Sequence, residues 1–359
     1  MVSLYFHIPF CSKKCPYCHF YVIPNKLSFH GLLQEGLHLE WQQQQHLLLN
    51  QQITSIYFGG GTPTLFGAKN IGEVLSWCKP PPDCEITVEA NPEDATVELF
   101  SELKAIGVNR LSLGVQSLDD RALATLERTH NAQRAKTALH AAQAAGISNV
   151  SIDLMYDLPD QTLSSWQYTL DQLVDLPFTH LSLYNLTIEP HTSFSKRKLQ
   201  LPGPETSVQF LYMALEKFAH LGLERYEISA FAKPGFRSKH NLGYWQFRPF
   251  LGFGPSAFSY WGGERFQNVP NLQRYVRQLR AGQSAVSFRE KLGPEESRKE
   301  RLAVGLRCAD GCSTEGVSAE TRVVLEKLVG QGLVSENGGG VKLTEKGMLF
   351  YDTVASELV

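Results

Sequence analysis

Three cysteines near the N-terminus, Cys11, Cys15 and Cys18, have a spacing that suits metal chemistry. They follow a short apolar segment in the pattern C-x-x-x-C-x-x-C, so a single loop carries all three thiols. Three thiolates bind three irons of a [4Fe-4S] cluster and leave the fourth iron without a protein ligand. The spacing therefore predicts a cluster with one open iron. A structural zinc ion is the alternative, with the adjacent His19 as its fourth ligand in strained geometry.

A glycine-rich segment, 59–64 (GGGTPT), directly follows an apolar segment that ends at Phe58. Missing side chains let the backbone approach a ligand closely, and carbonyl oxygens suit the amino group of a methionine moiety. No lysine follows as in a phosphate-binding P-loop, which disfavours nucleoside triphosphates. A plain tight turn is the alternative.

Polar residues also lie at the expected ends of other strands. Carboxylate and amide groups can bind ribose hydroxyls, and a guanidinium can bind a carboxylate in bidentate fashion. Taken singly, each residue fits a solvated charge equally well, but four on the same rim as the cysteine loop favour ligand binding. These residues are Glu89, Gln116, Arg128 and Asp153.

The elements that position these residues alternate between apolar strands and amphipathic helices, which is typical of parallel βα units. Right-handed crossovers place the C-terminal ends of the strands on one rim, where functional residues should collect. The predicted strands are 2–8, 53–58, 85–90, 110–114, 150–154 and 180–185. The predicted helices include 28–50, 97–106 and 131–145, the last with Gly146 as its C-cap. The fold class is therefore α/β, with a partial (β/α)6 TIM-like barrel.

The segment after the barrel has weaker patterns. A basic loop at 196–203 is followed by a predicted helix at 205–221 and a predicted strand at 225–231. The aromatic and glycine-rich segment 243–263 has no clean period, which favours a packed, irregular loop against the barrel mouth.

The C-terminal part changes character at Gly293. Charged helices, a two-stranded hairpin and a final helix at 344–358 predict a small winged-helix-like α+β module. The predicted domains are thus a barrel over 1–200, a barrel extension over 201–290 and a C-terminal module over 291–359.

The overall composition excludes several classes of protein. A hydrophobic share of 43% with 19% charged residues is ordinary for a soluble globular chain of 359 residues. The net charge of −2 gives no long-range attraction for polyphosphate, so we expect no nucleic-acid partner. Without a long apolar run or a charged leader before Val2, a cytoplasmic location is predicted. Seven cysteines, three of them within eight residues, do not suit a disulfide scaffold.

Together these segments resemble the radical S-adenosylmethionine (SAM) family of oxygen-independent coproporphyrinogen III dehydrogenases, also called oxidases (HemN-like). The resemblance covers most of residues 1–290 in order. It rests on YFHIPFC at 5–11, the cysteine triplet, GGGTPT, EANP at 89–92, GVQ at 114–116 and DLMYDLP at 153–159. It implies SAM on the open iron, with contacts to SAM or the cluster environment from Tyr5, Tyr17, Gly60, Gly61, Thr62, Glu89, Gln116, Arg128 and Asp153, and from Tyr184 and Thr187 as further candidates.

The chain departs from the dehydrogenases in two places. Their motif has another cysteine two residues after the third, where this chain has Phe20. They also carry an N-terminal extension, whereas this chain begins three residues before Leu4 and Tyr5. Both departures weaken the case for decarboxylation of a porphyrinogen.

Residues 240–245 instead read HNLGYW, an H-N-x-x-Y-W motif similar to the haem-binding signature of the HemW branch, the haem chaperones of the same family. An imidazole can ligate haem iron, and Tyr and Trp supply flat surfaces for a porphyrin face. The resemblance makes His240 the candidate iron ligand, and a satisfied core histidine is the alternative.

The resemblance implies a haem chaperone that transfers haem to acceptor proteins, with the cluster and SAM serving regulation, dimerisation or transfer. The expected partners are haem and haem-accepting proteins. A homodimer and a peripheral membrane contact through acceptors are also expected, without coproporphyrinogen III dehydrogenase activity. The alternatives are that dehydrogenase itself and a tRNA-modifying radical SAM enzyme, which the mild net acidity disfavours. The four other cysteines, Cys78, Cys84, Cys308 and Cys312, are interpreted as structural, and no role is assigned to His130 and His191.

Overall fold

Six parallel strands form the centre of the fold in this computed structural model, which describes residues 1–359 except for the side chain of Asn337. They pair in chain order, so each strand lies beside the next one of the βα series. The strands are β1 (Val2–Ile8), β4 (Ile53–Gly60), β5 (Glu85–Ala90), β6 (Arg110–Gln116), β7 (Asn149–Tyr156) and β8 (His180–Asn185). The predicted partial (β/α)6 barrel is confirmed, and each predicted strand is correct to within about two residues.

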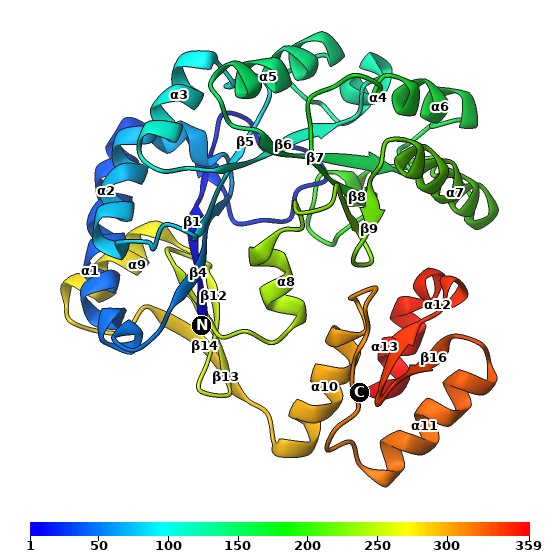
Figure 1. The fold of residues 1–359 in the computed structure, drawn as a ribbon. Coiled ribbons are helices and arrows are strands. Elements are labelled where there is room, and N and C mark those ends of the chain that lie inside the picture. The colour runs from blue at the N-terminus through cyan, green and yellow to red at the C-terminus, as the bar shows by residue number, and fades with distance from the viewer.

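Helices follow these strands and cover the outer face of the curved sheet (Figure 1). They are α1 (Leu27–Gln44), α2 (Ala68–Cys78), α3 (Val97–Ala105), α4 (Asp120–Thr125), α5 (Ala132–Ala144) and α6 (Leu163–Asp171). Thr96, Asn131 and Thr162 each accept a backbone hydrogen bond at a helix start, as N-caps do. Gly146 ends α5 at a positive φ of 76°, as predicted. The predicted helix 28–50 becomes a 3-10 helix, η1, after residue 44.

The side chains of each strand alternate between an apolar outer face and a polar inner face. On β1, Leu4, Phe6 and Ile8 are completely buried in the main hydrophobic core. On the other face, the register sets Ser3 beside Ser55, and Ser55 Oγ donates to Ser3 Oγ at 2.9 Å. Because strand residues alternate in this way, the interior of the barrel is lined by polar groups.

The aromatic segment after the barrel is regular, so the prediction of an irregular loop at 243–263 was wrong. A short helix, α8 (Lys239–Trp245), precedes four strands that extend the sheet beyond β1. Two further short strands beyond β8 bring the sheet to twelve strands in the described chain. The first of them pairs in parallel with β1, and the others follow antiparallel. Residues 250–253 (FLGF) and 258–261 (FSYW) are nearly all apolar or aromatic, so no clear alternation shows in the sequence. They are β11 (Phe250–Phe253), β12 (Phe258–Trp261), β13 (Glu264–Asn268) and β14 (Val286–Lys291), with α9 (Leu272–Arg280) before β14.

The predicted strand at 225–231 was also wrong, because the chain turns back on itself there. This segment follows α7 (Pro204–His220), and α7 confirms the predicted helix at 205–221. β9 (Glu224–Arg225) and β10 (Ala230–Ala232) pair antiparallel, and β10 adds to the edge of β8. The Glu227 carboxylate accepts the Ser229 N–H at 2.9 Å and so stabilises the turn.

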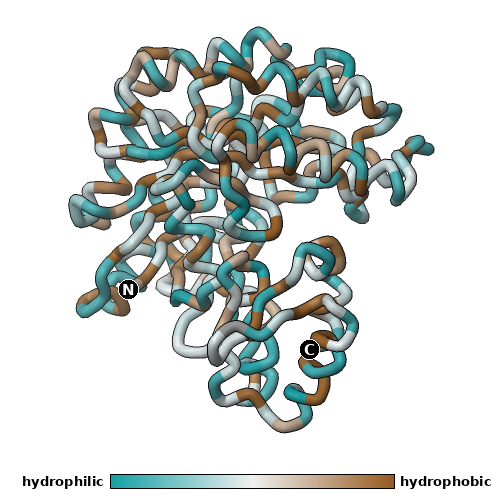
Figure 2. Tube along the Cα trace, turned by 45° about the vertical axis from the view of Figure 1, so that its right-hand side comes forward, coloured by the Kyte–Doolittle hydropathy of each residue, from teal (hydrophilic) through white to brown (hydrophobic). Residues whose placement is uncertain are grey.

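A second hydrophobic core forms the C-terminal lobe, which lies beside the barrel (Figures 1 and 2). A three-stranded sheet in the order β15-β17-β16 lies among its helices, so the predicted winged-helix-like module is confirmed. Its elements are α10 (Pro294–Gly305), β15 (Cys312–Ser313), α11 (Ala319–Gly330), β16 (Val334–Asn337), β17 (Gly340–Leu343), α12 (Glu345–Leu349) and α13 (Tyr351–Leu358). The predicted final helix is thus broken at residue 350. The exact domain limits at 200 and 290 stay a prediction.

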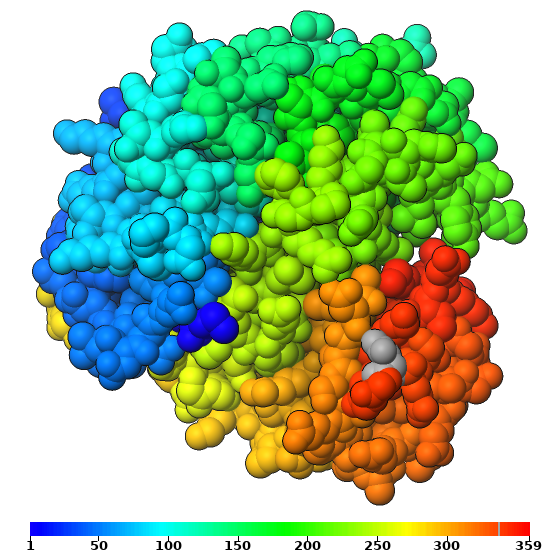
Figure 3. Space-filling model, in the orientation of Figure 1, coloured from blue at the N-terminus to red at the C-terminus, as the bar shows by residue number. Residues whose placement is uncertain are grey.

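The lobe packs against the segment that contains α8 (Figure 3). Arg307 forms an ion pair with Glu227 at 3.3 Å, and Arg237 pairs with Asp310 at 2.8 Å. Among the helices that the structure describes, none is both long and apolar enough to cross a membrane.

Helix α8 lies on the open, inner side of the curved sheet (Figure 1). The buried Glu85 carboxylate, at the start of β5, accepts the backbone N–H groups of Lys239 (3.0 Å) and His240 (2.9 Å). A carboxylate at a helix N-terminus satisfies free N–H groups and complements the helix dipole. Glu85 therefore fixes α8 to the barrel.

We expect Glu85→Ala to lower the free energy of unfolding by about 1–2 kcal/mol, because two buried N–H groups lose their acceptor. Amide hydrogen exchange in 238–245 should rise. Asp83→Ala is the control, since the exposed Asp83 side chain lies two residues away. Equal exchange in both variants would contradict this role of Glu85.

Candidate functional site

The loops at the C-terminal ends of the parallel strands enclose a cavity of about 460 Å³. The cysteine loop after β1 and the GGGTPT segment after β4 line it together with the ends of β5, β6, β7 and β8. It is lined by nearly all of the residues predicted for the cluster and SAM: Cys11, Cys15, Cys18, Tyr17, Gly60, Gly61, Thr62, Glu89, Gln116, Arg128 and Asp153, and also Tyr184 and Thr187. Tyr5 and His240 lie deeper, inside the barrel.

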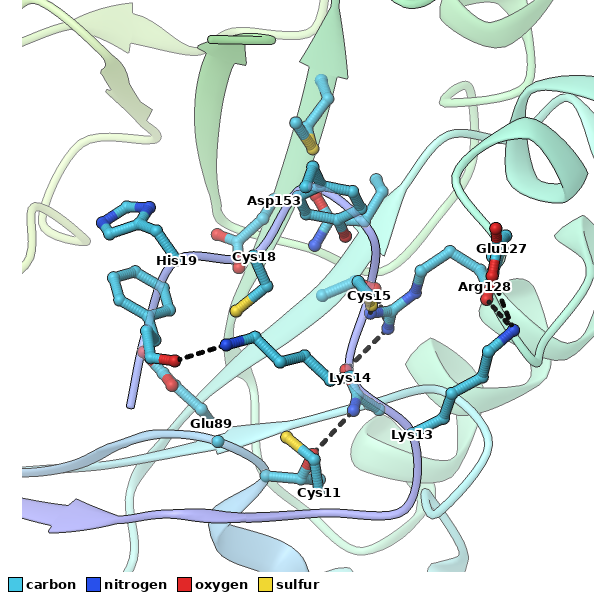
Figure 4. Close-up of a pocket in the computed structure, with 18 of the residues that line it drawn as sticks. Cys11, Lys13, Lys14, Cys15, Cys18, His19, Glu89, Glu127, Arg128 and Asp153 are labelled. Atoms are coloured by element: carbon cyan, nitrogen blue, oxygen red, sulfur yellow. Dashed lines mark hydrogen bonds and ion pairs between the residues drawn. The ribbon is translucent and has the colours of Figure 1, made fainter. Parts of the chain in front are cut away.

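The three cysteines lie on one loop around the same space, with Glu89, Asp153 and Arg128 facing it from other strands and loops (Figure 4). Within the described chain, no group of three or more His, Cys, Asp and Glu side chains could hold a single metal ion. Three thiols on one loop suit a cubane cluster, in which each of three irons takes its own thiolate, whereas a zinc site would need a fourth ligand. Burial raises the pKa of Cys11 to about 11, so binding iron through its thiolate releases a proton.

The glycine run packs closely on the strand that leads into the cysteine loop. Gly61 N donates to Ile8 O at 2.9 Å, and Thr62 N donates to Phe10 O at 2.7 Å. A Cβ on Gly60, whose φ is +113°, would overlap the His7 ring, and a Cβ on Gly61 would lie 2.5 Å from Phe10 O. These glycines are thus required by packing on β1.

Two carboxyl groups line the cavity in a partly desolvated environment. Burial and the nearby Asp153 raise the pKa of Glu89 to about 7. Two hydrogen bonds act in the opposite direction and lower this pKa: Tyr57 Oη donates to Glu89 Oε1 at 2.8 Å, and Gly60 N donates to Oε2 at 3.0 Å. Burial also raises the pKa of Asp153 to about 6. Both groups therefore change charge near neutral pH and can accept hydrogen bonds from a cationic or hydroxyl-bearing ligand.

Gln116 and Arg128 approach the cavity from β6 and the loop beyond it. Gln116 has a φ of +65°, which is uncommon for a residue with a side chain. Such strained positions cluster at ligand sites. Arg128 Nη1 donates to Cys15 Sγ at 3.3 Å, and Nη2 donates to Gly114 O at 3.1 Å.

A loop from the far side of the barrel packs on the cysteine loop. Phe194, in η3 (Phe194–Lys196), donates its N–H to Pro16 O at 2.9 Å, and its ring centroid lies 6.2 Å from that of Tyr17. Glu127 pairs with both Lys13 (3.2 Å) and Arg197 (2.7 Å). The cysteine loop is therefore held from two sides.

The predicted haem ligand is buried in the barrel interior. His240 is 1% exposed, and its Nδ1 and Nε2 lie 2.9 Å from Ser55 Oγ and 2.8 Å from Tyr244 Oη. Because Ser55 gives its proton to Ser3, the His240 Nδ1–H donates to Ser55 and Nε2 accepts from Tyr244. Burial lowers the pKa of His240 to about 3, so the imidazole is neutral. Tyr5 packs beside it, with ring centroids 6.5 Å apart.

Comparison with known proteins agrees with this architecture. Residues 5–173 match the Radical SAM superfamily, and residues 292–350 match the HemN C-terminal domain. The curated haem chaperone HemW of Bacillus subtilis is 34% identical, covering 99% of this chain and 98% of the relative. HemW of Escherichia coli is 32% identical, covering 98% and 97%. This chain belongs to the HemW family.

The solved structure of coproporphyrinogen III oxidase (HemN) from Escherichia coli has the same fold as this HemW family member. The TM-score is 0.87 at 24% identity, over 99% of this chain and 89% of that one. At this level of identity, the likeness supports the fold alone.

One cavity residue of this HemW family member was missed by sequence reasoning. Asn91, within the EANP segment, lines the cavity and contacts both Arg128 and Thr62. Likewise, His130 has a partner that sequence did not reveal, the Glu93 carboxylate at 3.1 Å. Two signals were available for Asn91: its position directly after a predicted strand and its place within the EANP segment of the resemblance.

We expect the stability of the protein to fall more steeply between pH 5 and pH 8 than that of Glu89→Gln, by about 1–2 kcal/mol. In the folded protein Glu89 stays protonated up to about pH 7, whereas in the unfolded chain it loses its proton near its ordinary pKa. The protonated Glu89 therefore stabilises the fold at low pH, and this stabilisation is lost as the pH rises from the unfolded pKa through the folded pKa of about 7. Chemical denaturation at both pH values measures the difference.

The exposed Glu73 on α2 provides the matched control, and Glu73→Gln should follow the wild type. Parallel pH curves for the wild type and Glu89→Gln would contradict the raised pKa.

Proposed function

We propose that this chain is a haem chaperone that holds a [4Fe-4S] cluster and SAM in the cysteine-lined cavity, binds haem at α8 and passes it to acceptor proteins. One observation carries the proposal: the H-N-x-x-Y-W motif lies on α8 in a chain that matches HemW proteins along nearly its whole length.

The residues of the cavity fit the cluster and SAM. Cys11, Cys15 and Cys18 would bind three irons. When bound, the cluster supplies one-electron reduction and an open iron for the amino and carboxylate groups of SAM. Glu89 would accept hydrogen bonds from the amino group, and Arg128 would bind the carboxylate.

The ribose of SAM would bind near the ends of β6 and β7. Asp153 and Gln116 supply an acceptor carboxylate and an amide there. Burial desolvates the Asp153 carboxyl, so hydrogen bonds to it act in an environment of lowered dielectric constant.

Haem, as the cargo, would bind through the α8 motif. Tyr244 and Trp245 line a separate apolar cleft of about 200 Å³, next to Phe250, Phe258 and Tyr260. Flat aromatic walls suit a porphyrin face. Arg248 also lines this cleft, and its guanidinium group suits a carboxylate of haem, whereas Arg265 already pairs with Glu290 and Glu300.

Ligation of haem iron by His240 would require one local change. Its Nε2 lone pair accepts the hydrogen bond from Tyr244 and would have to exchange that bond for iron. The imidazole is already neutral, which is the form that ligates metals. A shift of α8 out of the barrel would open this route.

Other parts of the functional prediction stay proposals. These are the cytoplasmic location, the homodimer and the peripheral membrane contact through acceptors. The rival activity of a coproporphyrinogen III dehydrogenase is disfavoured by the half-exposed Phe20 on the cavity wall, where those enzymes have a cysteine.

We expect the reconstituted protein to contain about four irons per chain and Cys15→Ala to lose most of them. Removing one thiolate leaves a second iron without a protein ligand. Iron and acid-labile sulfide counts measure the loss. Cys78→Ala should keep its cluster, because Cys78 is buried on α2 away from the cavity. Zinc in place of iron would overturn the assignment.

We expect His240→Ala to weaken haem affinity by about tenfold or more, as seen by titration of the haem absorption band. His220→Ala is the control, because His220 is exposed at the end of α7. The same preparation should not convert coproporphyrinogen III under anaerobic reducing conditions. Equal haem uptake by both variants would refute the role of His240, and turnover would favour the dehydrogenase.

A further inference from the structure

A series of contacts joins two of the three cavity cysteines through Asn91, a residue to which the proposed function gives no role. Its Nδ2 donates to Thr62 Oγ1 at 2.9 Å, and its Oδ1 accepts from Arg128 Nη2 at 2.6 Å. Arg128 Nη1 donates to Cys15 Sγ at 3.3 Å. Thr62 Oγ1 lies 3.8 Å from Cys11 Sγ. Asn91 is therefore the centre of a continuous hydrogen-bonded chain with a cysteine sulfur at each end.

The chemistry of the side chains fixes the direction of each hydrogen bond. Arg128 has only donors, so it must face the amide oxygen of Asn91, and the amide NH₂ then faces Thr62. Thr62 Oγ1 accepts this bond and keeps its own hydrogen. A Cys11 thiolate bound to iron has no hydrogen of its own, so Thr62 would then donate to Cys11 Sγ, and both cysteine sulfurs would accept a hydrogen bond from this chain.

The surroundings hold Asn91 and Arg128 in place. A Cβ on Gly114 would lie 3.1 Å from Asn91 Oδ1, so this glycine leaves the space that the amide occupies. Arg128 Nη2 also lies 3.9 Å from the Glu93 carboxylate. Burial raises the pKa of Glu93, but hydrogen bonding, chiefly from His130, lowers it to about 2, so its negative charge persists at neutral pH.

We propose that Asn91 is a positioning residue that raises the reduction potential of the cluster by orienting Arg128 and Thr62 towards Cys15 and Cys11. Reduction adds negative charge to the cluster and its sulfur ligands, so N–H and O–H donors stabilise the reduced form more than the oxidised form. The inference rests on the cluster site of the proposed function and is independent of haem binding.

The main test uses Asn91→Leu, which keeps a similar volume and removes both hydrogen bonds. The midpoint potential of the reconstituted full-length protein is measured by redox titration with electron paramagnetic resonance. We expect the reduction equilibrium constant to fall about tenfold, which is about 59 mV for one electron. Iron content and haem uptake should match the wild type.

Asn109→Leu is the matched control. Asn109 also makes two side-chain hydrogen bonds, accepting from Ile86 N and donating to Cys84 O, both at 2.8 Å. It lies before β6, at the end of the sheet opposite the cavity. Loss of the Asn109 amide should destabilise the fold without changing the midpoint potential of the cluster. An equal shift in Asn91→Leu and Asn109→Leu would overturn the inference.

A second pair of variants keeps the inference testable if Asn91→Leu folds poorly. Thr62→Val removes the hydroxyl between Asn91 and Cys11 and should lower the potential. Thr64→Val, in the same segment, should leave it unchanged, because the buried Thr64 hydroxyl has no hydrogen-bond partner in the described structure.

The two levels of failure are distinguishable. A normal cluster whose potential is unchanged in both Asn91→Leu and Thr62→Val would overturn the inference alone. A wild-type protein that assembles no cluster would overturn the cluster site and the inference together. Loss of haem uptake in the wild type would contradict the chaperone function and leave the measured potentials standing.

Discussion

The close approach of two backbone segments is the constraint on which the site depends. The glycine run after β4 donates hydrogen bonds to the carbonyl groups of Ile8 and Phe10, just before Cys11. Side chains on Gly60 or Gly61 would collide with His7 or with the Phe10 carbonyl. This contact fixes where the cysteine loop leaves the sheet. Phe194 and the Glu127 ion pairs then hold the loop from the other side, next to the strand ends that carry Glu89 and Asp153.

Sequence reasoning located the barrel and most of the cavity because their signals are local. Each parallel strand is a short β-favouring segment in which apolar and polar residues alternate, and the cysteines lie within eight residues of one another. Asn91 was missed because its two partners, Thr62 and Arg128, are 29 and 37 residues away. Long-range pairing of this kind leaves no local pattern, so only the folded structure reveals it.

The same reasoning explains the errors after the barrel. Strands such as β11 (FLGF) and β12 (FSYW) have four residues each, nearly all of them apolar or aromatic, so they show no clear alternation. The motif at 240–245 was recognised from its residues, but its burial was not predictable. Burial depends on Glu85 and Ser55, which come from strands far away in the sequence.

The burial of His240 has a consequence for the proposed transfer of haem. A side chain with both nitrogens satisfied in the resting state binds iron only after the protein has broken contacts of its own. The free energy of that opening is subtracted from the affinity, so the apparent dissociation constant rises as the open fraction falls. In the proposed chaperone, His240 would therefore hold haem less tightly than an imidazole that needs no opening. The return of α8 to its buried position would favour release of haem to an acceptor.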